Sequence, residues 1–196
     1  NRREQRRILD AYVALLEDLG YVEGRALTAR GRVARMINGY ELQVTQACFE
    51  GVLENLPVDA LAIVFVGLVY GERGRGEIPW VPAKLFCNVR TSVQRTVHDL
   101  VVRAADHGLS ATIQVPDWGL TAATQAWLSG ATFEHVMEHT EATPGDVVRT
   151  FRMAVQLMRQ VRRAIDPSWD LHETLGRAME ALNHDVVDAR RQLELG

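Results

Sequence analysis

Residues 143–165 read TPGDVVRTFRMAVQLMRQVRRAI and carry the clearest helix start in the chain. Threonine is a favoured N-cap and proline is favoured at the first helical position, so Thr143 and Pro144 mark this start. An acid three residues after the cap, Asp146, completes the pattern of a capping box. Apolar residues then recur at spacings of three and four, so the segment predicts a long amphipathic helix over residues 144–165.

Similar spacing along the rest of the chain predicts an all-α fold, a multi-helix bundle of about nine helices. Glycines and prolines interrupt the pattern, and residues 21–27 read as a short extended or hairpin-like link. We expect one helical domain over residues 1–196, divided into an N-terminal helical and linker part (1–40), central helices (41–143), and the long helix with a closing helix (144–196). The other expected helices are 4–19, 28–37, 41–55, 57–69, 83–107, 121–128, 132–139 and 170–193.

The helix at 144–165 is the basic element of a mildly acidic chain. The chain has 22 Lys+Arg against 25 Asp+Glu and a formal charge of −3, whereas residues 144–165 hold five arginines and one acid. At about 100° per residue, polar side chains fall on one arc of this helix and apolar ones on the opposite arc. The polar arc consists of Arg149, Arg152, Gln156, Arg159 and Arg163, with Met153 at its border.

This polar arc has two interpretations. Guanidinium groups pair with phosphate and stack on bases, so the arc is suited to bind an anionic chain. Alternatively it is a solvated face whose arginine stems cover apolar surface, or whose charge is neutralised by acids of the last helix. A solvated face normally mixes charges in i,i+4 pairs, and here no acid occurs between residues 147 and 165.

The sequence shows no catalytic constellation. Lys84, the single lysine, sits between Ala83 and Leu85, so the chain lacks the Gly-Lys-Ser/Thr of a phosphate-binding loop. His135 and His139 have a spacing that can hold a metal, but Val136 follows the first, so the HExxH motif is absent and no third ligand is obvious. We therefore expect no enzymatic activity, no cofactor and no metal in this chain itself.

The remaining features bear on location. The longest apolar run, residues 60–70, is shorter than the roughly 20 residues that span a bilayer. No apolar signal region follows the basic start at residues 2–7, and Cys48 and Cys87 form no CxxC pair. We expect a soluble cytoplasmic protein in which both cysteines are small core hydrophobes, although one disulfide between them is geometrically possible. Because the chain begins with Asn rather than Met, we interpret it as a fragment.

Several stretches occur together in an order and spacing typical of one family. They are LGYVE (19–23), LTARGRVA (27–34), EL (41–42) before FEGV (49–52), LPVDALA (56–62), LVY (68–70), and AWLSGATF (126–133), which leads through GDVVR (145–149) to LMRQ (157–160). Together they resemble the DSHCT domain, the carboxy-terminal helical domain of superkiller-type and exosome-associated DExH-box RNA helicases, with the bacterial branch the most similar.

The resemblance implies an accessory domain of an ATP-dependent RNA helicase. In that family an upstream motor carries the P-loop and DExH box and uses ATP and Mg²⁺, and a ratchet helix of the helical domain lies along single-stranded RNA. That helix corresponds here to residues 144–165. The implied partners are single-stranded RNA, the motor domains of the same protein and RNA-decay proteins. The implied RNA contacts are Arg149, Arg152, Met153, Gln156, Arg159 and Arg163.

This chain departs from the family pattern at three positions. The family commonly has a basic residue at the position of Met153 and an acid at that of Gln156, so we expect the contact to be weaker or to shift toward the neighbouring arginines. It also tends to have Glu where Gly71 stands. Three other functions stay open: a protein-interaction platform without direct RNA contact, marked by a large exposed apolar patch; a DNA-binding helical module; and a metal hydrolase built on His135 and His139.

Overall fold

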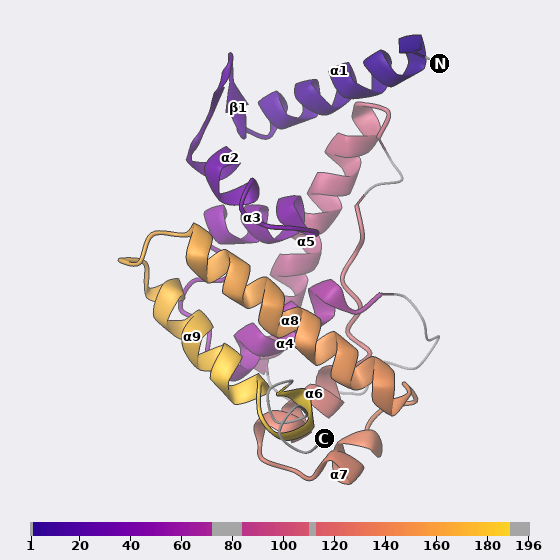
Figure 1. Ribbon diagram of the computed structural model, residues 1–196, viewed down its shortest axis with the longest axis vertical. Coiled ribbons are helices and arrows are strands. Elements are labelled where there is room, and N and C mark those ends of the chain that lie inside the picture. The colour runs from indigo at the N-terminus through magenta and orange to yellow at the C-terminus, as the bar shows by residue number, and fades with distance from the viewer. Residues whose placement is uncertain (1, 72–83, 110–112, 189–196) are drawn as a thin grey trace.

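The computed structural model describes residues 2–71, 84–109 and 113–188, and the statements below concern these residues. They form nine α-helices and a single short hairpin, which confirms the all-α bundle (Figure 1). The helices are α1 (Arg2–Asp18), α2 (Ala29–Ala34), α3 (Glu41–Phe49), α4 (Val58–Val69), α5 (Lys84–Asp106), α6 (Thr121–Leu128), α7 (Phe133–Met137), α8 (Pro144–Ala164) and α9 (Asp170–Leu182). The hairpin joins β1 (Val22–Glu23) to β2 (Ala26–Leu27), and a 3-10 turn, η1 (Asp185–Val187), follows α9.

Helix α4 forms the centre of the molecule. Its sequence is apolar on every side, and all ten residues from 60 to 69 are buried. Helices with this composition are stable only when surrounded by other elements. Here α8 and α9 cover one side of α4, while α5 and α6 also pack against it. The apolar arc of α8 therefore faces α4 and α9, and the polar arc is left at the surface.

The start of α8 has the predicted cap. The Thr143 hydroxyl accepts from the backbone N–H of Asp146 at 3.2 Å and donates to the Asp146 carboxylate at 2.9 Å, while Pro144 opens the helix. At the other end, Ile165 adopts an extended conformation just before Asp166-Pro167. The expected boundaries of 144–165 are thus confirmed to within one residue.

Four expected helices end earlier than predicted: α2 at Ala34 and α7 at Met137 by two or three residues, and α3 and α9 by more. The last helix ends at Leu182 rather than at residue 193, because His184 is extended and Asp185 has a φ of 45°, outside the helical region. The ring of His184 stacks on Trp127 at 4.0 Å, and the Trp127 Nε1 donates to the carbonyl of Leu182. These contacts with α6 explain the early end; residues 189–193 of the expected helix lie outside the described part.

Helix α3 also ends early, at Phe49 rather than at residue 55. Gly51 and Asn55 have φ values of 72° and 56°, so the chain turns there instead of continuing as a helix. Pro57 is the cap of α4 rather than its first helical residue. The expected hairpin-like link at 21–27 is confirmed as β1 and β2.

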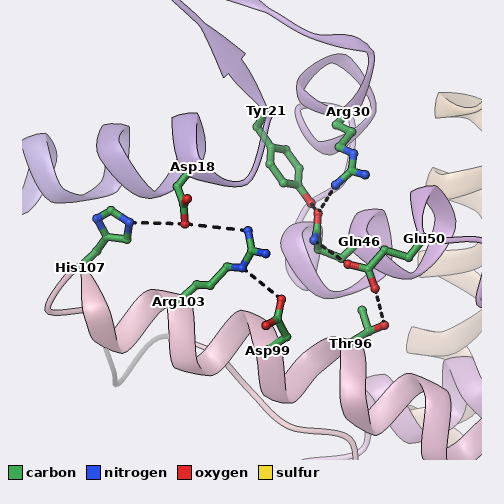
Figure 2. A network of polar contacts seen from close by, with 9 residues as sticks. All are labelled: Asp18, Tyr21, Arg30, Gln46, Glu50, Thr96, Asp99, Arg103 and His107. Carbon is green, nitrogen blue, oxygen red and sulfur yellow. Dashed lines mark hydrogen bonds and ion pairs between the residues drawn. The ribbon is translucent and has the colours of Figure 1, made fainter.

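A polar network fastens the N-terminal elements to α5 (Figure 2). The amide oxygen of Gln46 accepts from the Tyr21 hydroxyl and from Arg30, both at 3.0 Å. The amide nitrogen of Gln46 donates to Glu50, whose other oxygen accepts from Thr96 of α5 at 2.6 Å. Because its polar atoms are mutually satisfied, this network holds the segment from β1 to α3 in one orientation.

Candidate nucleic-acid interface

The polar arc of α8 lies at the surface as predicted. We call Arg149, Arg152, Met153, Gln156, Arg159 and Arg163 the arginine face. Of these, Arg149, Met153, Gln156 and Arg163 are exposed, whereas Arg152 and Arg159 are half-buried. Acids are absent from residues 147–165, so within α8 only Asp146, in the first turn, can offset the positive charge of the arginine face.

A groove of about 650 Å³ runs along one side of the arginine face. Phe133 of α7 and Val186 of η1 form its far wall, and Val148 and Met153 of α8 contribute further apolar surface. Arg149, Arg152 and Gln156 of α8 also line the groove. Its lining thus combines apolar surface with guanidinium and amide groups, a combination suited to bases and phosphates of a single strand.

A smaller hollow of about 190 Å³ lies on the other side of α8. It is lined by Tyr40, Tyr70 and Gln114, and Arg149 and Met153 line it as well as the groove. These two α8 side chains therefore form a ridge between the two hollows. We call them the Arg149–Met153 ridge.

Tyr40 is held in an unusual conformation beside this ridge. Its φ is 59°, in the left-handed region that costs a non-glycine residue energy and that recurs at functional sites. Burial raises the pKa of the Tyr40 hydroxyl, and the nearby Arg149 guanidinium partly offsets that rise. The phenol is therefore a neutral hydrogen-bond donor, and it faces the carbonyl of Val69 at 3.4 Å.

The arginines of α8 differ in how strongly the protein itself engages them. Arg152 donates from Nε to the carbonyl of Val187 and from Nη2 to that of Val186, both at 2.9 Å. It thereby anchors η1, the wall of the groove. Arg159 donates to the Gln156 amide oxygen at 2.7 Å, so this pair is mutually oriented within the arginine face.

Arg149 and Arg163 of the arginine face are held weakly or not at all by described residues, whereas Arg162 contacts α9. Arg149 lies 3.8 Å from the Asp146 carboxylate, a distance at which a partly exposed pair contributes little, and Arg163 makes no ion pair with any described residue. Arg162, outside the arginine face, donates to the carbonyl of His172 at 3.0 Å. Its guanidinium lies over Gly176 of α9, where an added Cβ would meet it at 3.2 Å.

Most of the chain, including the segments around the groove, matches a known protein family. Residues 24–189 match the family described as the DSHCT (NUC185) domain. The chain belongs to the DSHCT family. The match covers α2 to η1 and hence all the walls of the groove, and it confirms the resemblance drawn from the sequence motifs.

Three relatives align with most of this DSHCT chain, and two of them are named as RNA helicases. The chain is 23% identical over 190 residues to the DExH-box ATP-dependent RNA helicase DExH11 of Arabidopsis thaliana, an alignment that covers 90% of the chain and 14% of the relative. It is 25% identical over 155 residues to the human Superkiller complex protein 2, covering 78% and 12%. It is 22% identical over 187 residues to the human Exosome RNA helicase MTR4, covering 89% and 17%. The DSHCT chain therefore spans between an eighth and a sixth of the length of these relatives.

Sequence reasoning found the helix of this DSHCT chain but missed the walls around it. Phe133 and Tyr70 belong to the quoted motifs, yet nothing in their spacing indicated that they would border α8. Tyr40, Gln114 and Val186 reach the site from segments far apart in the sequence.

The two histidines come together without forming a metal centre. The rings of His135 and His139 lie 5.0 Å apart edge to face, and His135 Nδ1 lies 2.9 Å from the Glu138 carboxylate. Within the described ranges, no group of three His, Cys, Asp or Glu side chains is arranged to hold a metal. In the same ranges no helix is both long and apolar enough to cross a membrane.

Proposed function

We propose that this chain is the accessory helical domain of an ATP-dependent RNA helicase and binds single-stranded RNA along the arginine face of α8. The observation that carries the proposal is an arginine face at the surface of α8, with no acid between residues 147 and 165, beside a groove with apolar lining, in a DSHCT domain two of whose relatives are RNA helicases.

The proposed RNA contacts are of two kinds, ion pairs with phosphates and stacking of bases. Arg149, Arg159 and Arg163 pair with phosphates, since guanidinium groups match phosphate geometry. Bases stack against the apolar lining of the groove, where Met153 and Phe133 provide contact surface. Both kinds of contact tolerate any sequence, which suits an enzyme that moves along RNA. Arg152 acts in this scheme by holding η1 in place as the wall of the groove.

We infer that a motor elsewhere in the parent protein binds ATP and Mg²⁺ and hydrolyses ATP. The domain's role is non-covalent: it retains the strand between power strokes, so that each stroke moves RNA in one direction. By the same inference the parent acts in the cytoplasm together with RNA-decay proteins.

The proposal is tested with the motor-containing protein and a labelled single-stranded oligouridylate. Each phosphate contact contributes about 0.7 to the slope of log affinity against log salt concentration. Replacing Arg149, Arg159 and Arg163 together with Ala should weaken binding and flatten that slope by about 2. Arg177→Ala is the control, because this α9 arginine is exposed and pairs with Glu173 instead of lying on the arginine face. An unchanged affinity and slope in the triple variant would refute the RNA assignment.

A protein-interaction platform without RNA contact is the alternative. One observation favours it: α1 exposes the apolar side chains Ile8, Leu9 and Val13. Helix α1 lies at the opposite end of the molecule from α7 (Figure 1), and α7 contributes to the groove, so both functions are compatible.

A further inference from the structure

The loop before α3 presents an aromatic residue whose position helix capping does not explain. Tyr40 is the N-cap residue of α3, but its side chain makes no cap hydrogen bond. Favoured N-cap residues combine a short polar side chain with an extended backbone, whereas Tyr40 is aromatic and left-handed at a φ of 59°. Asparagine or glycine adopts this conformation at lower cost, so local structure alone does not account for a tyrosine here.

Helix α8 holds this loop in place. The side-chain oxygen of Gln160 accepts from the backbone N–H of Asn38 at 2.9 Å. On the other side of the loop, the carbonyl of Tyr40 accepts from the backbone N–H of Val44 in α3 at 3.0 Å. A strained backbone persists only where its surroundings hold it, and these two contacts supply such support. The helix that carries the arginine face therefore also positions Tyr40.

Tyr40 borders the smaller hollow beside the arginine face. It lines this hollow together with Arg149 and Met153, and its hydroxyl lies 3.4 Å from the carbonyl of Val69. The side chain is half-buried, so part of the ring is accessible from the hollow. The exposed side chain of Gln114 lines the same hollow. An aromatic ring, a thioether, an amide and a guanidinium are groups that stack on a base, bond to its edge and pair with its phosphate.

The Arg149–Met153 ridge separates this hollow from the groove. Both ridge side chains line both spaces, so a strand that crosses the ridge places one base on each side of it. The phosphate that joins those two nucleotides then lies at the ridge, beside the Arg149 guanidinium. The groove supplies Phe133 as aromatic surface, and the hollow supplies Tyr40. Each space thus has an aromatic wall of its own, and the two share one cation.

We propose that Tyr40 is a base-stacking residue and that the smaller hollow is a second base site, across the Arg149–Met153 ridge from the groove. This inference rests on the proposed function, because the strand that enters the hollow is the one bound by the arginine face. Stacking tolerates any sequence, since every base has a π face, so the site takes any nucleobase of a single strand. The phenol is neutral, so Tyr40 adds affinity without adding to the salt dependence.

Three single variants of the motor-containing protein test the proposal with labelled oligouridylate. Tyr40→Asn removes the ring and should weaken binding about tenfold, as expected for the loss of one stacked base. Asparagine tolerates the left-handed region and is a favoured N-cap, so the fold is retained, which circular dichroism verifies. Tyr40→Phe keeps the ring and should bind within about twofold of the wild type.

Trp169→Asn is the matched control and should leave binding unchanged. Like Tyr40, Trp169 is an aromatic N-cap residue without a cap hydrogen bond, in this case at the start of α9. It is 37% exposed and lines neither the groove nor the smaller hollow. A loss of affinity in Tyr40→Asn alone therefore reports on the hollow rather than on the removal of an exposed aromatic ring.

A strand without bases separates stacking from effects on the backbone. An abasic oligonucleotide of equal length keeps its phosphates, so Tyr40→Asn should leave its binding unchanged, while the triple variant of Arg149, Arg159 and Arg163 still weakens it. Equal weakening on both strands by Tyr40→Asn overturns the proposal, and so does unchanged binding of oligouridylate. In either case a flattened salt slope in the triple variant leaves the proposed function standing. An unchanged affinity and slope in the triple variant refute both together.

Discussion

Replacing Arg152 with Leu separates its structural role from RNA contact. The change removes two hydrogen bonds of 2.9 Å to the carbonyls of Val186 and Val187 while keeping an apolar stem over α8. Hydrogen bonds from a charged donor contribute about 1.5–3 kcal/mol each, and the half-buried position of Arg152 reduces this through solvent screening. We expect a loss of about 2–3 kcal/mol in the free energy of unfolding. For a chain of this size, that loss lowers the melting temperature by roughly 5–10 °C.

Two measurements on Arg152→Leu are compared with the same measurements on Arg163→Leu. Urea unfolding gives the stability, and oligonucleotide binding by the motor-containing protein across a salt series gives the number of phosphate contacts. Arg152→Leu should lower stability and leave the salt slope unchanged. Arg163 is exposed and makes no ion pair with a described residue, so Arg163→Leu should change stability by less than about 0.5 kcal/mol and reduce the slope by about 0.7. If Arg152→Leu leaves stability intact and lowers the slope, Arg152 binds phosphate and its anchoring role is refuted.

Three further predictions concern buried residues. Gly67→Ala should destabilise the chain by about 1–2 kcal/mol in urea unfolding. The added Cβ would lie 2.8 Å from the buried ring of Trp118. Overpacking costs about 1–3 kcal/mol, which outweighs the gain of about 1 kcal/mol in helix propensity. Gly145→Ala, where the Cβ meets nothing within 4 Å, should be neutral or stabilising; equal effects of the two changes would contradict the packing analysis. Burial raises the pKa of the Cys48 thiol to about 12, so a disulfide reagent at pH 8 should titrate the exposed Cys87 at once and Cys48 only after unfolding. Stability contributed by this raised pKa is complete below the unfolded value of 9.0 and is lost as pH rises toward 12, which a pH series of unfolding curves would reveal as a decline on the alkaline side.

Elements with strong local signals were predictable from the sequence. The cap at Thr143 and the apolar period after it placed α8 correctly, since both depend on residues within the helix itself. The alternation of turns and short apolar segments likewise gave the hairpin before α2. The polar arc of α8 was located for the same reason, because a helical period alone determines which side chains share a face.

Features that depend on contacts between distant segments were not predictable. The early end of α9 results from the stacking of His184 on Trp127, residues that no sequence period connects. The role of Arg152 depends on the path of the chain through Val186 and Val187 after α9 has ended. Arg152 and Arg163 look equivalent on a helical wheel, yet one anchors the groove wall and the other is exposed.

The burial of α4 over residues 60–69 has a mechanical consequence for α8. The apolar arc of α8 interlocks with side chains of α4 and α9, and protein interiors packed in this way have low compressibility. A pulling force applied to the arginine face therefore cannot be absorbed by rolling or sliding of α8 over its neighbours. Helix α8 therefore moves together with the helices it packs against, and the force is transmitted to the whole bundle.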